Sequence, residues 1–262
     1  MRMKLFPLLF RLLLFGEERE ILGRLWLFFV VASIGMALRF LVLGKFEWGQ
    51  LLIVSGFLAG VLLIWGIERW QAWRDASYEG AEDEDVWHTH MAERFWTGKK
   101  RLFKGTKKMG EFWRFFPLPW QRIVNSILSD QNQWYLNLSF AFADGTSVQI
   151  IEQREKLFRV NDTWHIVQNG AVVAVARTDY SWKNKLKLRE RMIVEIQGKT
   201  LFFQSPEMVS RTEVWLDGKM IAEGKRSRLL RWRYTFRVNE GYEEWERLLV
   251  AAYVLFNYAY HQ

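Results

Sequence analysis

Apolar residues form two long runs near the N-terminus of the chain. Residues 25–43 and 51–67 are almost wholly apolar, and the polar turn Gly44-Lys45-Phe46-Glu47 separates them. Each run has about the length of the roughly 20 residues that a helix needs to cross ~30 Å of hydrocarbon. Because the connection is short, the two helices must run antiparallel. The pattern predicts a transmembrane helical hairpin over residues 21–70, so the chain enters and leaves the membrane on the same side.

The first twenty residues mix the cations Arg2, Lys4 and Arg11 with leucine and phenylalanine. A secretory signal has an unbroken apolar core and small residues at a cleavage site, and this segment has neither. We expect residues 1–20 to lie in the membrane interface or, alternatively, to pack as a helix on the hairpin.

Beyond residue 133 the apolar positions alternate with a period of two. Residues 134–142 read W-Y-L-N-L-S-F-A-F, and Asp144-Gly145, Asn169-Gly170 and Asp217-Gly218 provide turn signals. Further strands are predicted at 148–151, 157–160, 164–168, 171–176, 192–196, 200–204, 212–216, 220–222 and 229–238. Regular short strands of this kind predict one antiparallel barrel or sandwich over residues 131–262.

The chain closes with an apolar helix. Glu243, Glu244 and Glu246 supply negative charge to its first turn, and residues 248–258 read L-L-V-A-A-Y-V-L-F-N-Y. The segment is apolar on every side but short for a membrane span, so we expect a helix buried inside the domain.

A family resemblance follows from three of these segments. They are the hairpin 213–222 (E-V-W-L-D-G-K-M-I-A), the strand 231–238 (R-W-R-Y-T-F-R-V) and the closing helix 243–260. Residues 133–262 resemble the tubby C-terminal superfamily, which includes LURP-one-related and phospholipid scramblase-like proteins. The resemblance implies a closed barrel threaded by its terminal helix, and a barrel that binds phosphoinositides through basic residues. The fold class is therefore an α+β membrane protein with an N-terminal hairpin and a tubby-like barrel that encloses its C-terminal helix.

Two charged segments connect the hairpin to this domain. Residues 71–92 are acidic and predict a flexible tether, and His88 and His90 near its end predict a solvated loop rather than a metal site. Residues 93–130 interleave cations with aromatic rings, including Lys99, Lys100, Arg101 and Lys104. This second segment is either a juxtamembrane stretch whose rings insert at headgroup depth or a basic face packed on the following domain.

Charge predicts the orientation of the chain and the chemistry of its ligand. The net charge is +8, and cations flank the hairpin at both ends, whereas the turn offers only Lys45. By the positive-inside rule, we expect a cell-membrane protein with two spans and both termini in the cytoplasm. The chain has no cysteine, so disulfides, thiolate metal sites and cysteine catalysis are excluded.

Basic residues of the domain form two clusters. In the first, cations at every second position share one face of an extended strand; in the second, two arginines do the same. The members are Lys183, Lys185, Lys187, Arg189 and Arg191 in the first cluster, and Arg226, Arg228, Arg231 and Arg233 in the second, in which Arg231 and Arg233 share the face. They form either a solvated outer surface or a docking surface for anionic lipid.

Three classes of function remain. We favour a non-enzymatic, cytoplasm-facing module that binds or senses anionic lipid at the inner leaflet, without a cofactor, a metal or nucleic acid. A structural subunit of a larger membrane complex is the alternative. An enzyme is the third class, but the sequence contains no nucleophile elbow, zinc helix or nucleotide fingerprint that would indicate one.

Overall fold

The computed structural model describes residues 20–44, 48–80, 86–91, 98–121, 135–153, 161–179, 190–205, 211–227 and 232–260. The chain divides into two compact units. One contains residues 1–73 and 118–134, and the other contains residues 74–117 and 135–262.

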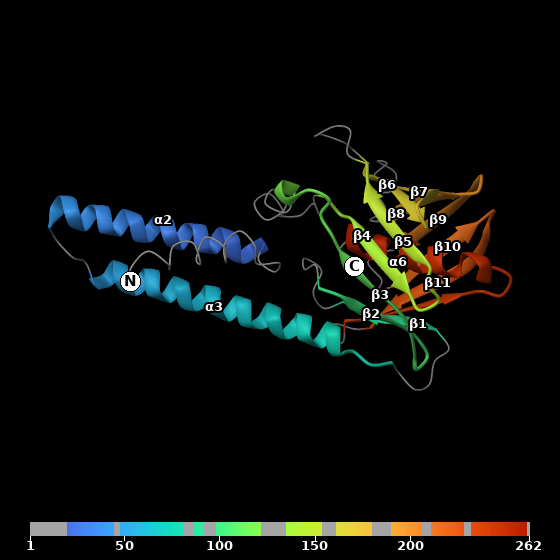
Figure 1. The fold of residues 1–262 in the computed structure, drawn as a ribbon, viewed down its shortest axis with the longest axis horizontal. Helices are drawn as coiled ribbons and strands as arrows, with labels where there is room; N and C mark the ends of the chain where they lie inside the picture. Colours follow the sequence, from blue (N-terminus) through green and yellow to red (C-terminus); the bar gives the residue numbers. More distant parts are fainter. Residues whose placement is uncertain are drawn as a thin grey trace. The chain divides into compact units, whose positions relative to one another are not determined.

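Twelve strands of the second unit form a closed antiparallel barrel (Figure 1). Each strand pairs with its neighbours in the sequence, and β1 closes the barrel by pairing with β12, with Trp87 opposite Phe236. Closure leaves no free sheet edge over the paired residues. The strands are β1 (Trp87–His90), β2 (Lys100–Lys104), β3 (Lys107–Arg114), β4 (Leu138–Phe142), β5 (Ser147–Glu152), β6 (Thr163–Gln168), β7 (Ala171–Thr178), β8 (Glu190–Ile196), β9 (Lys199–Ser205), β10 (Arg211–Leu216), β11 (Lys219–Arg226) and β12 (Arg233–Val238).

The alternation in the sequence explains the barrel interior. In β8, Met192, Val194 and Ile196 are buried while Ile193 and Glu195 face outward. The same period of two repeats in β6, β9 and β10. Because side chains on a strand point alternately to its two faces, these strands place one apolar row inside the barrel.

Tight turns join the strands at one end of the barrel. Asn169 and Gly170 have φ of 49° and 87°, and Asp217 and Gly218 have φ of 50° and 78°. Two successive positive φ angles are typical of type I′ hairpin turns. The turns predicted at these two pairs are therefore confirmed.

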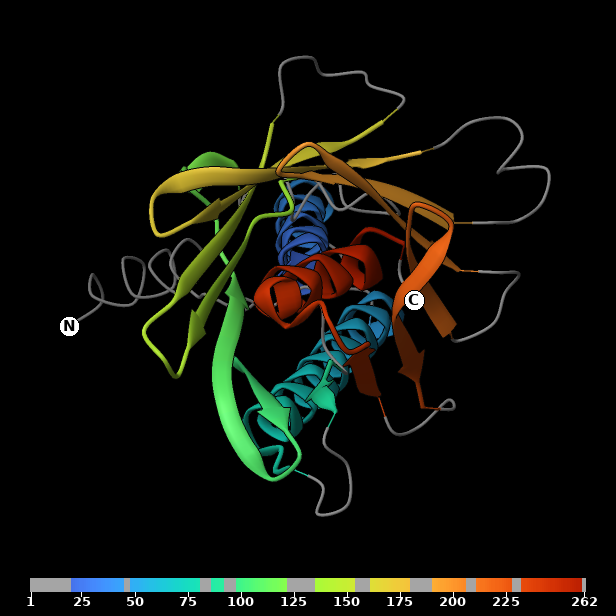
Figure 2. The ribbon, with the colours of Figure 1, turned by 90° about the vertical axis from the view of Figure 1, so that its right-hand side faces the viewer.

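Helix α6 (Glu246–Ala259) lies inside the barrel, where Figure 2 shows it surrounded by strands. It follows the short 3-10 helix η1 (Glu243–Trp245). All residues from Leu248 to Tyr258 are buried, and Tyr253 stacks on Phe236 of β12 with ring centroids 4.6 Å apart. The prediction of a terminal helix enclosed by the barrel is confirmed.

The barrel begins earlier in the chain than residue 131, where the sequence placed its start. Strands β1, β2 and β3 come from segments that were predicted to be a tether and a juxtamembrane stretch. Phe103 and Phe112 are buried in the barrel, with exposed fractions of 6% and 0%. Of the two interpretations of this segment, packing on the domain therefore describes β2 and β3.

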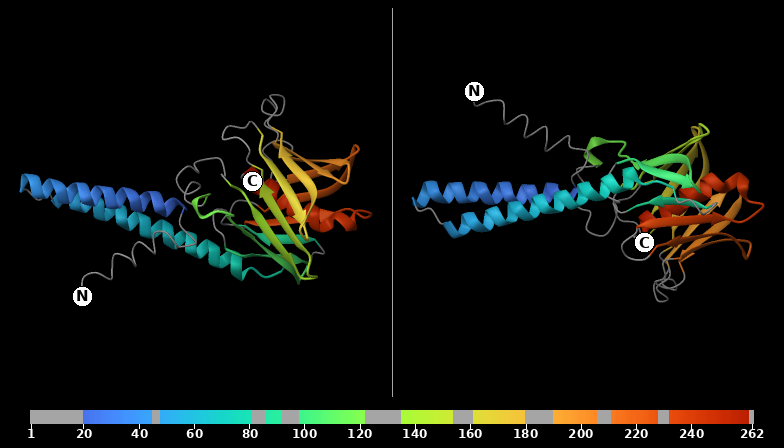
Figure 3. Two further views of the ribbon diagram at one scale, coloured as in Figure 1. Left: turned by 45° about the horizontal axis from the view of Figure 1, so that its top comes forward. Right: turned by 90° about the horizontal axis from the view of Figure 1, so that it is seen from below.

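The first unit contains two long helices. They are α2 (Glu20–Leu43) and α3 (Trp48–Ser77). The last residues of α3, from Arg74 onward, belong to the barrel unit. The helices lie side by side (Figure 3), and the rings of Phe28 and Phe57 are 4.8 Å apart. Within the described residues, one helix, α3, is long and apolar enough to cross a membrane. The expectation of two spans remains a prediction.

Candidate functional site

The strand topology gives the barrel two different ends. At one end, which we call the loop end, lie His90, Lys100, Arg114, Glu190 and Arg233, each the first or last residue of its strand. At the opposite end, the turn end, lie the tight turns and the start of α6. The long connections of the chain, including 154–160, 180–189 and 228–231, all join strands at the loop end.

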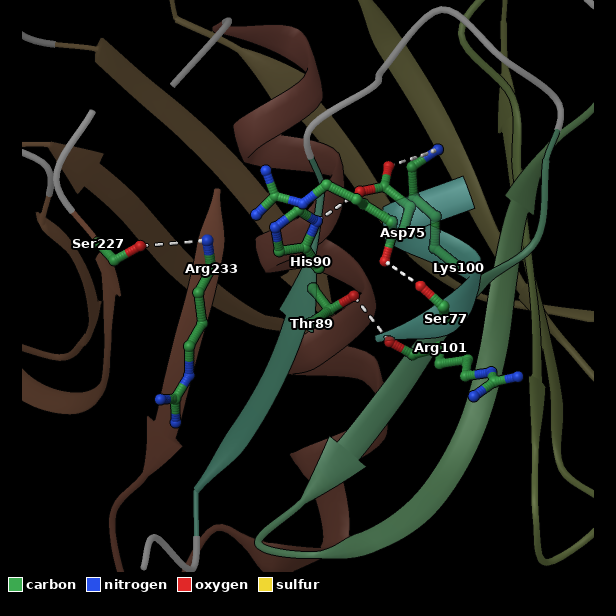
Figure 4. A network of polar contacts seen from close by, with 9 residues as sticks. Asp75, Ser77, Thr89, His90, Lys100, Arg101, Ser227 and Arg233 are labelled. Atoms are coloured by element: carbon green, nitrogen blue, oxygen red, sulfur yellow. Dashed lines mark hydrogen bonds and ion pairs between the residues drawn. The ribbon is translucent and has the colours of Figure 1, made fainter. Parts of the chain in front are cut away.

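A buried ionic cluster occupies the loop end where α3 finishes (Figure 4). The Nδ1 atom of His90 lies 2.5 Å from Asp75 Oδ1, and Lys100 Nζ lies 3.9 Å from Asp75 Oδ2. No more than 5% of any of these three side chains is exposed. Since a carboxylate accepts, His90 donates from Nδ1. Asp75 therefore ties the last turn of α3 to β1 and β2.

His88, the other histidine of β1, also makes hydrogen bonds within the barrel unit. Its Nε2 lies 2.7 Å from the carbonyl oxygen of Gly105, to which it donates, so Nδ1 accepts from the hydroxyl of Tyr78 at 3.0 Å. The ring of His88 also stacks on Phe103. The predicted solvated loop is wrong here, because His88 and His90 lie in a buried strand. The described residues contain no group of three or more potential metal ligands.

The cations predicted from 99–104 fall into different environments. Lys100 is buried, which differs from the exposed contact that the sequence suggested. Lys99 is 67% exposed, with Nζ 3.6 Å from Glu111 and 5.2 Å from the ring centroid of Trp113. A hydrogen bond from Lys108 lowers the pKa of Glu111, which keeps this carboxylate ionised. Arg101 of β2 is partly exposed, and its carbonyl oxygen accepts a hydrogen bond from Thr89 Oγ1 (Figure 4).

Lys104 lies apart from these residues, at the turn end. Its Nζ donates to Glu246 Oε1 at 2.8 Å, beside a cavity of about 660 Å³. Glu243 lines the same cavity, and a hydrogen bond from the backbone N–H of Gly241 lowers its pKa. Acidic and basic groups are mixed around this cavity, and Lys104 is therefore not one of the cations at the loop end.

The structure brings the ends of the two basic clusters to the loop end. Arg191 of β8 contacts Asp179 at 3.8 Å and lies over the ring of Phe202. Its carbonyl accepts a hydrogen bond from the Tyr260 hydroxyl, which links it to the chain after α6. Arg233 begins β12, and its backbone N–H donates to Ser227 Oγ at 3.2 Å (Figure 4).

Most of the predicted cluster residues lie in the adjoining connections, outside the described residues. These are Lys183, Lys185, Lys187 and Arg189 between β7 and β8, and Arg228 and Arg231 between β11 and β12. Neither 180–189 nor 228–231 contains an acidic residue. Both connections start and finish at the loop end, although they are far apart in the sequence.

Sequence reasoning missed Asp75 as part of the site. Its position at the end of an apolar helix and before an acidic stretch resembles a tether, and only the fold brings it to His90 and Lys100. For β2 and β3, the sequence did contain a signal of a hairpin. Gly105-Thr106 separates two segments with apolar residues, and the structure buries these apolar residues.

Comparisons with known proteins gave one match. The family model described as the Tubby C-terminal like domain matches residues 99–260. Neither the curated proteins nor the solved structures gave a match. The matched range begins one residue before β2 and ends just after α6, so it contains every strand except β1.

Proposed function

Since the chain belongs to the tubby C-terminal-like domain family, we propose that it is a non-enzymatic, membrane-anchored module whose barrel binds anionic lipid at its loop end. The observation that carries the proposal is topological. The connections 180–189 and 228–231, which carry most of the basic residues, join strands at the same end of the barrel, where the last turn of α3 contacts β1.

Helix α3 supports the anchoring part of the proposal. At 1.5 Å per residue, its 30 residues extend about 45 Å, which exceeds the ~30 Å hydrocarbon core. Its most apolar 18-residue window has no buried part, and Leu52 and Ile53 are 72% and 74% exposed. A surface of this kind is costly in water and is satisfied by lipid.

Helix α2 supplies the second proposed span. Its apolar part, Leu27–Leu43, is slightly shorter than the roughly 20 residues needed, and it lies beside α3. Cations precede the apolar part of α2, at Arg19 and Arg24, and follow the apolar part of α3, at Arg69 and Arg74. By the positive-inside rule, these charges favour cytoplasmic termini, with the barrel against the inner leaflet.

The loop end supplies the electrostatic part. Each cation near an anionic leaflet contributes about 1 kcal/mol of attraction. A barrel tethered to the membrane meets lipid at a high effective concentration, so modest contacts suffice. The two acid-free connections 180–189 and 228–231 are the regions that we expect to contact headgroups.

The test is lipid binding by the full chain in neutral detergent micelles, titrated with a fluorescent phosphatidylinositol phosphate. The triple variant Lys185→Glu, Lys187→Glu and Arg189→Glu should weaken binding about 100-fold, since three cations contribute roughly 1 kcal/mol each. The matched control is Lys107→Glu, Lys199→Glu and Lys219→Glu at the turn end, which changes the net charge equally. Unchanged binding in the first variant, or an equal loss in both, would exclude the loop end as the lipid site.

A further inference from the structure

A short apolar segment follows strand β3 in the chain, after that strand ends at the loop end of the barrel. Residues 116–120 read F-P-L-P-W and follow the last residue of β3, Arg114, by two positions. In this segment Leu118 is 46% exposed and Trp120 is 49% exposed. We call residues 116–120 the apolar tip.

The structure separates this tip from the other aromatic residues of its region. Phe103 and Phe112 are buried in the barrel, and Trp113 is only partly exposed beneath Lys99. Phe116 packs against the guanidinium of Arg114, 5.0 Å from its ring centroid. Among the described residues 98–121, Leu118 and Trp120 are therefore the large apolar side chains with most surface in contact with solvent.

Local hydrogen bonds hold the tip in shape. The N–H of Gln121 donates to the carbonyl of Leu118 at 3.1 Å, and the N–H of Leu118 donates to Gln121 Oε1 at 3.3 Å. Pro117 and Pro119 restrict φ on either side of Leu118. These contacts order the turn through the backbone of Leu118, which lowers the entropic cost of binding through the Leu118 side chain.

Chain length fixes which end of the barrel the tip serves. An extended chain spans at most about 3.5 Å per residue, so Leu118 lies within roughly 14 Å of the end of β3. That end of β3 belongs to the loop end, together with the exposed cation Lys99. Exposed Leu and Trp that are this close in the chain to an end of the barrel carrying cations match the chemistry of the membrane interface, where apolar rings enter and charges meet headgroups.

We propose that the apolar tip inserts into the bilayer to which the chain is anchored, with Leu118 and Trp120 below the headgroups. The inference rests on the proposed function, because it takes the loop end to face the membrane. It adds a hydrophobic contact to the electrostatic one, and two weak contacts on one tether give stable docking.

Site-directed spin labelling tests the proposal, because the chain contains no cysteine of its own. The full chain with Leu118→Cys is spin-labelled and reconstituted into nanodiscs of neutral and anionic phospholipid. Oxygen partitions into the bilayer, whereas a nickel chelate stays in water, so their ratio at the label reports depth. We expect oxygen to relax the label more strongly than nickel.

Two matched positions make the result decisive. Val172 in β7 is apolar and 56% exposed, and it lies near the turn end, so the label in Val172→Cys should respond to nickel instead. Ile53 in α3 is 74% exposed, so the label in Ile53→Cys reports the anchor itself. A nickel response at position 118 with an oxygen response at position 53 would overturn insertion of the tip alone. A nickel response at both positions would overturn the anchor of the proposed function as well.

Discussion

At the scale of single residues, three charged or titratable side chains are buried together at the loop end. Asp75 contacts both His90 and Lys100, and all three side chains are nearly inaccessible to water. Taking an ion out of water is costly, and removal of one member of a buried pair leaves the other uncompensated. A cluster of this kind therefore fixes how strands and helix meet more than it adds to stability.

The first prediction concerns Asp75. Asp75→Ala should lower the free energy of unfolding by about 3 kcal/mol, because Lys100 then keeps its charge in a buried site. The same substitution should cost less in a Lys100→Met background, where no buried ammonium remains. Thermal unfolding of the four proteins of this double-mutant cycle in detergent measures the coupling. Strictly additive effects would show that Asp75 and Lys100 do not interact.

The second prediction concerns the closest approach of α6 to the barrel wall. A Cβ at Gly224 of β11 would overlap the ring of Tyr253, an α6 residue that stacks on Phe236 of β12. Gly224→Ala should therefore destabilise the barrel by about 1–3 kcal/mol, as overpacking does. Gly98→Ala is the control, since a Cβ there meets no atom within 4 Å. Equal melting temperatures of the two variants would contradict this packing.

At the scale of elements, α6 is held by its apolar surface along its length and by polar contacts at its start. Arg247 in its first turn forms an ion pair with Asp144 of the β4–β5 turn. The N–H of Thr146 donates to Asp144 Oδ1 at 3.1 Å. The hydrogen bond from Thr146, and then the charge of Arg247, lower the pKa of Asp144 below its usual 3.8.

This gives the third prediction, which concerns pH. A depressed pKa in the folded state means that the contribution of Asp144 to stability is present above pH 3.8 and is lost as the pH falls through the lowered pKa. The melting temperature of the wild type should exceed that of Asp144→Asn at about pH 6, and the difference should vanish towards roughly pH 2. Asp217→Asn, in the β10–β11 turn, is the control. A constant difference across this range would refute the assignment.

At the scale of the whole molecule, the sequence predicted the local elements of the barrel better than its boundaries. Strands from β4 onward and α6 followed from period-two alternation, Gly-containing turns and an apolar run too short to span a membrane. β1 was missed because the neighbours that bury His88 and His90, namely Tyr78, Gly105 and Asp75, are supplied by the fold. For β2 and β3 the sequence left two interpretations open, because the cations of this segment also resemble a membrane-proximal stretch.

The candidate site divides in the same way. The two basic clusters were visible as alternating cations, but nothing local in the sequence indicates that 180–189 and 228–231 reach the same barrel end. That follows from the antiparallel order of twelve strands. The sequence was misleading at Lys100. This lysine belongs to a basic run, but in the fold it is buried beside the carboxylate of Asp75.

The last prediction is the orientation of the chain in the membrane. Lys45 lies between α2 and α3, and Glu79 follows α3, so two membrane-spanning helices would put these positions on opposite sides. In intact cells, a membrane-impermeant maleimide should label the Lys45→Cys variant and leave Glu79→Cys unlabelled until lysis. The cysteine-free wild type controls for background. Labelling of Glu79→Cys in intact cells would place the barrel outside, where its loop end would not face the anionic cytoplasmic leaflet, and the electrostatic basis of the proposed lipid binding would be lost.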